Sequence, residues 1–167
     1  MNIGEAKELI ADLPLSPEAP LRWADLGCGS GTFTHALYRL LPPASTIYAF
    51  DTNRQTFHEP GIRFVQLDFE TQELPVPPLS GILMANSLHY ISDPQALITR
   101  LRQHLEPGGA LVLVEYDTNA PNRWVPFPVP LKKAKELAAL CGFKNFHQIG
   151  NRPSIYHGGG MYAAVFI

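Results

Sequence analysis

The stretch that decides the fold is Leu21-Arg-Trp-Ala-Asp-Leu-Gly-Cys-Gly-Ser-Gly-Thr-Phe-Thr34. Its first six residues are mainly apolar and predict a buried parallel strand. Glycines follow at the alternate positions Gly27, Gly29 and Gly31, and residues 32–37 then open a helix. A strand, a glycine turn and a helix start bring bare backbone N–H groups close to a ligand, which a Cβ atom would prevent. The stretch therefore predicts a ligand site, with a purely structural strand-to-helix turn as the alternative.

The spacing of these glycines limits the class of ligand that the turn is expected to bind. It is G-x-G-x-G, whereas the dinucleotide fingerprint G-x-G-x-x-G would need glycine where Thr32 stands. The strand also carries an acid, Asp25, two residues before the first glycine. A buried carboxylate is costly unless it is paired, so we expect it to meet a cation or several hydrogen-bond donors. A dinucleotide pyrophosphate would gain nothing from this acid, whereas the ammonium group of an amino acid would.

In this combination the chain resembles the class I S-adenosylmethionine-dependent methyltransferases, whose first motif is an acidic strand end followed by G-x-G-x-G. The resemblance implies S-adenosylmethionine as the cofactor and S-adenosylhomocysteine as the product. It also implies an α/β fold: a Rossmann-like, seven-stranded, mostly parallel sheet in the order 3-2-1-4-5-7-6, with helices on both faces and an antiparallel last strand. The residues expected to bind the cofactor here are Asp25, Gly27, Cys28, Gly29 and Gly31.

Composition describes a single soluble domain spanning residues 1–167. The hydrophobic content of 46% is ordinary, and a net charge of −2 offers no basic surface for nucleic acid or an acidic membrane. No run is long enough for a membrane span, and the polar N-terminus lacks the core of a signal peptide. Cys28 and Cys141 lie far apart and are expected to be free thiols of a reducing compartment. The expected location is cytoplasmic.

A second acid is predicted beside the glycine turn. Residues 46–51 form the predicted second strand, which ends in Asp51, 20 residues after Gly31. In a β-α-β unit such an acid lies where it can accept hydrogen bonds from ribose hydroxyls, and we assign the adjoining Thr52 to the same site. A solvated loop residue or a helix N-cap is the alternative interpretation of Asp51. The acid indicates a nucleoside-bearing ligand without choosing between NAD and S-adenosylmethionine.

Residues 62–68 form the predicted third strand. The methyltransferase resemblance implies that Asp68 receives the adenine amino group and that the backbone N–H of Phe69 reaches a ring nitrogen. Only ten residues separate the second strand from the third, and residues 69–80 contain three prolines. The helices after the second and third strands are therefore expected to be shortened or missing.

The next segment carries further family motifs. Residues 81–86 form the predicted fourth strand, Asp93-Pro94 starts a helix to about residue 105, and residues 110–116 form the fifth strand. The combination N-S-L-H-Y-I-x-D-P followed by L-x-P-G-G-x-L looks like the small bacterial type-11 methyltransferases. This resemblance spans about residues 21–116. With it we assign Asn86, at the end of the fourth strand, to the cofactor site.

The remaining elements complete the predicted sheet. A leading helix is expected over residues 2–13, with Asn2 and Glu5 at capping-box spacing, and the helix after the glycine turn should run to about residue 41. Residues 131–140 form another predicted helix, closed by Gly142. Two last strands, over residues 144–150 and 161–167, form an expected antiparallel hairpin joined by a loop at 151–160.

Several other chemistries are disfavoured. Short-chain reductases need a Tyr-x-x-x-Lys pair, and none of the six tyrosines has lysine four places on. The histidines have no metal-like spacing with one another or with the cysteines, so no metal site is expected. Methyltransferases that act on the amino groups of adenine or glutamine resemble one another in an Asn-Pro-Pro-Tyr-type motif, whereas Ser87-Leu88 follows Asn86 here.

Methyl transfer from a sulfonium needs alignment and exclusion of water, and it needs a general base only if the acceptor must lose a proton. His89 is the candidate base because it follows the fourth strand at the ligand-binding end of the sheet. A histidine that merely packs between strand and helix is an equally good interpretation. Tyr90, Tyr116 and Trp124 either line an acceptor pocket or simply cover the sheet. Arg152 and His157 are candidates for binding an anionic acceptor.

Two classes of function follow, and one question of assembly. The first class is a methyltransferase acting on a small molecule, and the second is a cofactor-binding module or non-catalytic subunit with the same fold. An NAD(P) enzyme is a weaker third possibility. The thinly covered second and third strands predict a homodimer through this region and residues 69–80. The rival account is that apolar residues of the 69–80 segment fold back over the third strand: Phe69, Leu74, Val76 and Leu79.

Overall fold

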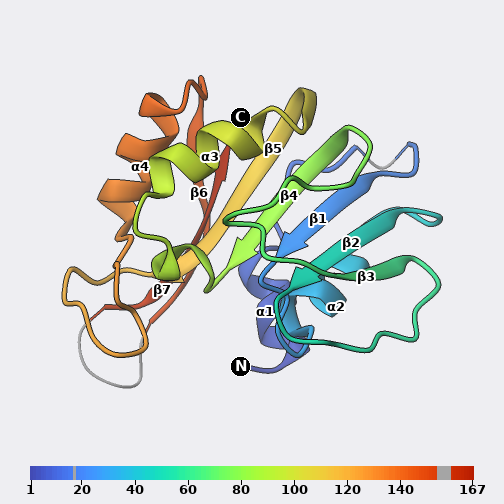
Figure 1. The fold of residues 1–167 in the computed structure, drawn as a ribbon, viewed down its shortest axis with the longest axis horizontal. Coiled ribbons are helices and arrows are strands. Elements are labelled where there is room, and N and C mark those ends of the chain that lie inside the picture. Colours follow the sequence, from blue (N-terminus) through green and yellow to red (C-terminus); the bar gives the residue numbers. More distant parts are fainter. Residues whose placement is uncertain (17, 154–158) are drawn as a thin grey trace.

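The structure, a computed structural model, describes residues 1–16, 18–153 and 159–167. Helices and strands alternate at the start of the chain, the second, third and fourth strands then follow one another without a helix, and two strands end the chain (Figure 1). The elements are α1 (Ile3–Leu9), β1 (Arg22–Leu26), α2 (Thr32–Tyr38), β2 (Thr46–Asp51), β3 (Ile62–Gln66), β4 (Leu79–Ala85), the 3₁₀ turn η1 (Leu88–Tyr90), α3 (Pro94–Arg102), β5 (Leu105–Tyr116), α4 (Leu131–Leu140), β6 (Phe146–Arg152) and β7 (Met161–Phe166).

The strands form one seven-stranded sheet in the order β3-β2-β1-β4-β5-β7-β6. The first five strands pair in parallel, and β7 runs antiparallel to both β5 and β6. The predicted fold class, strand order and antiparallel last strand are therefore confirmed. Strand order reverses beside β1, which has β2 on one side and β4 on the other. In open α/β sheets ligands bind at such a point, beyond the carboxyl ends of the strands.

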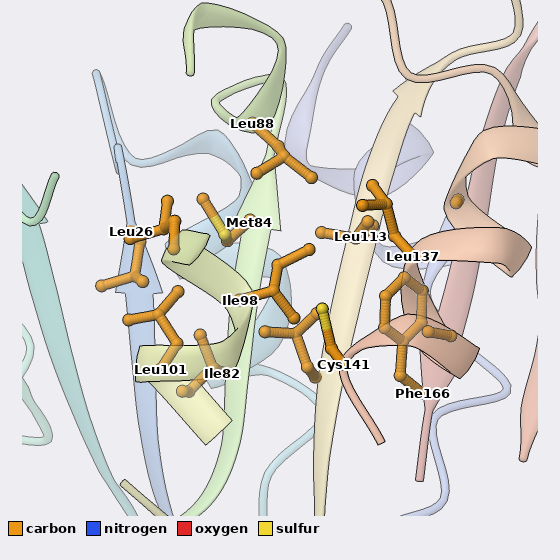
Figure 2. Close-up of a cluster of buried hydrophobic side chains, with 14 of the residues drawn as sticks. Leu26, Ile82, Met84, Leu88, Ile98, Leu101, Leu113, Leu137, Cys141 and Phe166 are labelled. Atoms are coloured by element: carbon orange, nitrogen blue, oxygen red, sulfur yellow. The ribbon is translucent and has the colours of Figure 1, made fainter. Parts of the chain in front are cut away.

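Helices cover both faces of the sheet, as predicted. On one face α3 and α4 bury their apolar stripes against β1, β4, β5 and β7 (Figures 1 and 2). Leu101 and Ile98 of α3 and Leu137 of α4 lie there against Met84 and Leu113 of the sheet. On the other face α1 and α2 pack over a second cluster that is centred on Trp23. These two layers hold the strand ends in place.

Local signals set the helix ends. The side chain of Asn2 accepts a hydrogen bond from the backbone N–H of Glu5, and the Glu5 carboxylate accepts one from the backbone N–H of Asn2, which is the predicted capping box. Asp93 caps α3, and Gly142 follows α4 in the left-handed region at φ 82°. Described helices are short, and none is both long and apolar enough to cross a membrane.

Some predicted bounds were wrong. The fifth strand begins at Leu105, not at residue 110, because Leu105 pairs with Leu79 and a register shift before Gly81 accommodates the intervening turn. Gly108 takes the positive φ of 79° that this turn requires. The helix before it accordingly ends at Arg102, three residues early. The leading helix, the helix after the glycine turn and the third strand are also shorter than predicted.

Between β2 and β4 the described chain contains no helix, as predicted, and loops take its place. On one face Leu74 is buried in the main core and Val76 packs against it. The guanidinium group of Arg100, on α3, holds this loop by donating to the carbonyl oxygens of Phe69 and Gln72 at 2.6 and 3.0 Å. A single chain thus covers this side of β3 itself.

The opposite face of the same strands is covered by the loop after β2. The ring of Phe57 lies against Phe64 of β3 and against His35 of α2, with ring centroids 6.4 and 5.5 Å apart. The apolar side chains that motivated the predicted homodimer therefore have partners within one chain. The homodimer itself stays a prediction.

Candidate functional site

The glycine turn after β1 is built as a backbone cradle. Gly27, Gly29 and Gly31 all have positive φ, at 79°, 50° and 87°. A Cβ on Gly27 would lie 2.6 Å from the Cβ of Ser87, whereas a Cβ on Gly29 would meet no atom within 4 Å. The middle of the turn therefore faces open space, which leaves room for a ligand. The predicted bare N–H groups were wrong for Gly27, Cys28, Gly29 and Gly31, because all four donate to acceptors within the protein.

The predicted acid Asp51 lies beside this turn. One carboxylate oxygen accepts a hydrogen bond from the backbone N–H of Gly29 at 2.9 Å, and the other accepts one from Asn53 at 2.8 Å. Each oxygen retains a further lone pair for a ligand. Asp51 thus connects the end of β2 to the glycine turn and can still accept hydrogen bonds from a ligand. The sequence did not predict the hydrogen bond between Asp51 and Gly29.

Two cavities open on either side of Gly27 and Asn86, both of which line each cavity. We call them the Asp51 cavity, of about 300 Å³, and the Asp25 cavity, of about 380 Å³. The predicted cofactor residues are distributed between them: Asp51, Thr52, Asp68 and Phe69 line the first, and Asp25, Cys28 and Gly29 line the second. Gly31 lines neither and instead closes the turn by donating to the carbonyl oxygen of Cys28 at 2.9 Å.

A larger cavity of about 600 Å³ lies elsewhere, between the start of β5 and residues 142–145. It is at the end of the sheet opposite the glycine turn and contains none of the predicted site residues. If volume alone decided, this larger cavity would be the candidate ligand site. The topological switch point and the two acids favour the smaller pair of cavities as the site.

Asp25 is almost completely buried, with 1% of its surface exposed, yet it lines a cavity. Its one side-chain partner among the described residues is the Thr34 hydroxyl, which donates at 2.6 Å. Burial raises the pKa of Asp25 to about 7, and the nearby Asp51 adds to the rise while Thr34 opposes it. A cation in the cavity would relieve this cost by stabilising the carboxylate.

Asn86 supplies a second incomplete polar group. It leaves β4 at a positive φ of 54°, which is uncommon for a residue with a side chain. Its backbone N–H bonds to Val114, but its side-chain oxygen is buried without a hydrogen-bond partner in the part of the chain that the structure describes. An unsatisfied acceptor between the two cavities is what a ligand N–H or O–H would complete.

Asp68 and Cys28 are more constrained than their predicted roles required. The carboxylate of Asp68 already accepts from the backbone N–H of Glu70 at 3.0 Å and from the Thr71 hydroxyl at 2.9 Å, so it also holds its own turn together. Burial and the neighbouring carboxyl groups raise the pKa of the Cys28 thiol well above its usual range. Cys28 is therefore a protonated lining residue, not a nucleophile.

His89, the candidate base, is buried and lines neither cavity. Its Nδ1 lies 2.6 Å from one carboxylate oxygen of Glu115, and its backbone N–H donates to the other oxygen at 3.2 Å. Both side chains are almost inaccessible, at 2% and 0% exposure. The centroid of the His89 ring lies 4.4 Å from that of Tyr90 and 6.2 Å from that of Tyr116. The histidine is thus adjacent to residues that line the cavities.

Glu115 was missed in the sequence. A signal was present, because it is an acid inside the apolar run from Ala110 to Tyr116, as Asp25 is inside its own strand. Ser87 was also missed: its hydroxyl donates to the carbonyl oxygen of Leu26 at 2.7 Å and holds β4 against the glycine turn.

The remaining candidate residues for binding the acceptor do not lie together at one site. Tyr116 lines the Asp25 cavity and Tyr90 lines the Asp51 cavity, whereas Trp124 is 70% exposed and lines neither. Arg152 is paired with Glu5, with nitrogen–oxygen distances of 2.8 and 3.3 Å. His157 lies outside the described residues. Within the described ranges no three His, Cys, Asp or Glu side chains gather as metal ligands would.

Comparison with known proteins identifies the family. A methyltransferase-domain model matches residues 2–152. A trans-aconitate 2-methyltransferase of Methylobacterium nodulans is 36% identical over 114 residues, which are 65% of this chain and 42% of that protein. One from Rhodopseudomonas palustris (strain HaA2) is 32% identical over 148 residues, 81% of this chain and 57% of that protein. The chain spans about half the length of these relatives.

Solved structures share the fold. Human N-acetylserotonin methyltransferase in complex with S-adenosylmethionine superposes with a TM-score of 0.71 at 21% identity, over 97% of this chain and 51% of that one. The methyltransferase domain of citrinin polyketide synthase gives 0.67 at 19% identity, over 99% and 52%. The chain belongs to the methyltransferase-domain family, and its fold is that of the class I S-adenosylmethionine-dependent methyltransferases.

Proposed function

We propose that this chain binds S-adenosylmethionine across the two cavities and directs its methyl group to a small-molecule acceptor. One observation carries the proposal. The glycine turn lies beside two cavities that share Gly27 and Asn86 and that each contain an acid, Asp25 in one and Asp51 in the other. A ligand with an ammonium group at one end and a ribose at the other matches that arrangement.

Each predicted residue then has a defined part. Asp51, with Thr52 beside it, accepts hydrogen bonds from the ribose hydroxyls, and Asp68 and Phe69 border the adenine. Asp25 faces the amino-acid ammonium. Backbone groups at Gly27, Cys28 and Gly29 line the amino-acid portion, the Asn86 side-chain oxygen accepts from the ligand, and Gly31 maintains the turn.

When bound, S-adenosylmethionine supplies a methyl group that its sulfonium sulfur has already activated. The task of the chain is then to hold the acceptor in line with that methyl group and to exclude water. We assign the acceptor to the Asp25 cavity and its rim, formed by residues 86–91, Tyr116 and the 117–130 loop. This region adjoins the amino-acid portion of the proposed cofactor site.

If the acceptor must lose a proton, His89 is our candidate for receiving it. When the Nδ1–H of His89 donates to Glu115, Nε2 is left with its lone pair free to act as a base. Glu115 would then act through His89 by selecting this tautomer and fixing the ring. Support for the assignment is the position of the His89 ring near the rings of Tyr90 and Tyr116.

We also propose finer assignments. The names of the relatives make trans-aconitate a candidate acceptor. The Asn86–Ile91 and Pro-Gly-Gly motifs support membership of the small type-11 group. Two buried free thiols, Cys28 and Cys141, support a reducing cytoplasmic location. We propose no nucleic-acid or membrane partner, and the homodimer through β2, β3 and residues 69–80 remains open.

Transfer of a labelled methyl group tests this function. The protein is incubated with methyl-tritiated S-adenosylmethionine and a panel of phenols, amines, thiols and carboxylic acids that includes trans-aconitate, and labelled product is counted. We expect transfer to at least one acceptor and its loss in Asp51→Ala at limiting cofactor. Binding of the cofactor without transfer to any acceptor would instead favour the non-catalytic module.

A further inference from the structure

Most of the large apolar side chains that remain exposed on the described molecule line one of the two cavities or belong to the loop after Tyr116. Tyr116 and Met1 line the Asp25 cavity, and Tyr90 lines the Asp51 cavity. Phe127 and Trp124 are exposed in the loop that follows Tyr116. Such a cluster beside a cavity marks a binding surface more often than scattered apolar residues do.

The loop that carries Phe127 and Trp124 is anchored to the site at several points. The backbone N–H of Phe127 donates to the carbonyl oxygen of His89 at 2.9 Å, and the Tyr162 hydroxyl donates to Val129 at 2.7 Å. Asp117 closes the loop by accepting from the backbone N–H of the residue after Pro130, at 2.9 Å. The aromatic side chains are therefore presented by a built loop next to the acceptor region.

Charge around the two cavities has one prevailing sign. The described residues that line them include four acids, Asp25, Asp51, Asp68 and Glu70, and no lysine, arginine or histidine. Arg152 is already paired with the carboxylate of Glu5. A small polycarboxylate would find no lysine, arginine or histidine among the described lining residues to pair with its carboxylates.

We propose that the methyl acceptor is an uncharged, planar aromatic molecule that binds against Tyr116 and the aromatic 117–130 loop. This inference rests on the proposed function and names its substrate class. Offset and edge-to-face contacts with aromatic rings favour a planar π-system over a saturated molecule of the same size. The lack of a lysine, arginine or histidine in the described lining disfavours a polyanion such as trans-aconitate.

Calorimetry on protein saturated with S-adenosylhomocysteine tests the proposal with three probes: 2-naphthol, cyclohexanol and trans-aconitate. We expect 2-naphthol to bind at least about tenfold more tightly than cyclohexanol. Trans-aconitate should give no saturable heat at the same concentrations. Tyr116→Ala and Trp124→Ala should each weaken 2-naphthol binding at least threefold, and Trp124→Ala should leave S-adenosylhomocysteine affinity unaltered because Trp124 lines neither cavity.

Leu140→Ala is the matched control, because Leu140 is also exposed but lies on α4 and lines neither cavity. It should leave 2-naphthol affinity unchanged. Tighter binding of trans-aconitate than of 2-naphthol, or 2-naphthol binding that neither aromatic substitution alters, would overturn the inference. If S-adenosylhomocysteine itself fails to bind, the proposed function fails, and the same comparison of probes on the protein alone still tests the aromatic preference.

Discussion

Asp25 and Glu115 lie near the carboxyl ends of β1 and β5, on either side of β4, and both are almost wholly buried. Their surroundings differ. The described partner of the Asp25 side chain is one hydroxyl group, whereas Glu115 uses both carboxylate oxygens on His89. Asp25 lines a cavity and Glu115 does not.

The difference shows that one edge of the sheet carries two kinds of buried acid. We call Asp25 the vacant acid, because it lines a cavity and keeps acceptor capacity, and Glu115 the filled acid, because the protein completes its hydrogen bonds. A buried acid whose hydrogen bonds are completed by the protein strengthens the fold, whereas one that is left incomplete destabilises it until a ligand arrives. We infer that Glu115 serves the architecture of the acceptor side and Asp25 serves the cofactor. Five measurements test these roles and that of the neighbouring Asp51.

The largest expected effect is on the stability of the protein when Glu115 is replaced. Glu115→Ala removes one partner of a buried hydrogen-bonded pair, so we expect a loss of about 3–5 kcal/mol in the free energy of unfolding. Asp25→Asn removes a desolvated acid and should leave stability unchanged or raise it. Urea unfolding at pH 8 measures both variants. Equal destabilisation by the two substitutions would contradict the distinction.

The next effect should be on the cofactor. Asp51→Ala removes an acceptor of two proposed charge-assisted hydrogen bonds, so S-adenosylmethionine binding should weaken by about 1.5–3 kcal/mol. Glu73→Ala is the control, because Glu73 is an exposed acid that lines neither cavity. Calorimetry measures both affinities. A similar loss in the control would show a general charge effect instead of a ribose contact.

A third effect should appear as pH dependence at the vacant acid. The pKa of Asp25 is raised to about 7 by burial, so lowering the pH through 7 protonates the carboxylate that the ammonium needs. S-adenosylmethionine affinity should fall by up to tenfold per pH unit below 7, about 1.4 kcal/mol. The Asp25→Asn variant lacks the titrating group and should lack this dependence. Parallel pH profiles for the two proteins would contradict the account.

Stability should depend on pH in the opposite sense. The pKa of the Asp25 carboxyl is about 3.9 in the unfolded chain and about 7 in the folded protein. Between these two pH values the folded state therefore binds more protons than the unfolded state. Stability should therefore fall as pH rises from 4 to 7 and then level off, and Asp25→Asn should remove that contribution. Urea unfolding across this range measures it.

The smallest effect on cofactor affinity is expected when His89, the hydrogen-bond partner of Glu115, is replaced. His89→Gln should change S-adenosylhomocysteine affinity by no more than about twofold, or 0.4 kcal/mol, because His89 lines neither cavity. Turnover of an acceptor that loses a proton should nevertheless fall. Full activity on such an acceptor would remove His89 from the mechanism.

Elements governed by local signals could be predicted from the sequence. The glycine turn, the capping box at Asn2 and the strand ending in Asp51 depend on residues a few positions apart, and their positions in the chain followed from spacing. The family resemblance added the strand order. Bounds failed at β5, where pairing between Leu105 and Leu79 decided the start of the strand.

The parts that could not be predicted depend on contacts between distant segments. Glu115 and His89 are 26 residues apart, and only the arrangement of β4 beside β5 brings the two side chains together. Arg100 reaches the loop after β3 from α3 for the same reason. Hydrophobic pattern predicts burial, but it carries no information on which buried polar groups meet.

Calorimetric titration of the protein at pH 8 with S-adenosylmethionine, S-adenosylhomocysteine and NAD tests the central claim most directly. If the cradle at Gly29 and its two acids form an S-adenosylmethionine site, the first two ligands should bind saturably at a single site. NAD should then give no saturable heat at the same concentrations. Preferential binding of NAD would contradict the account.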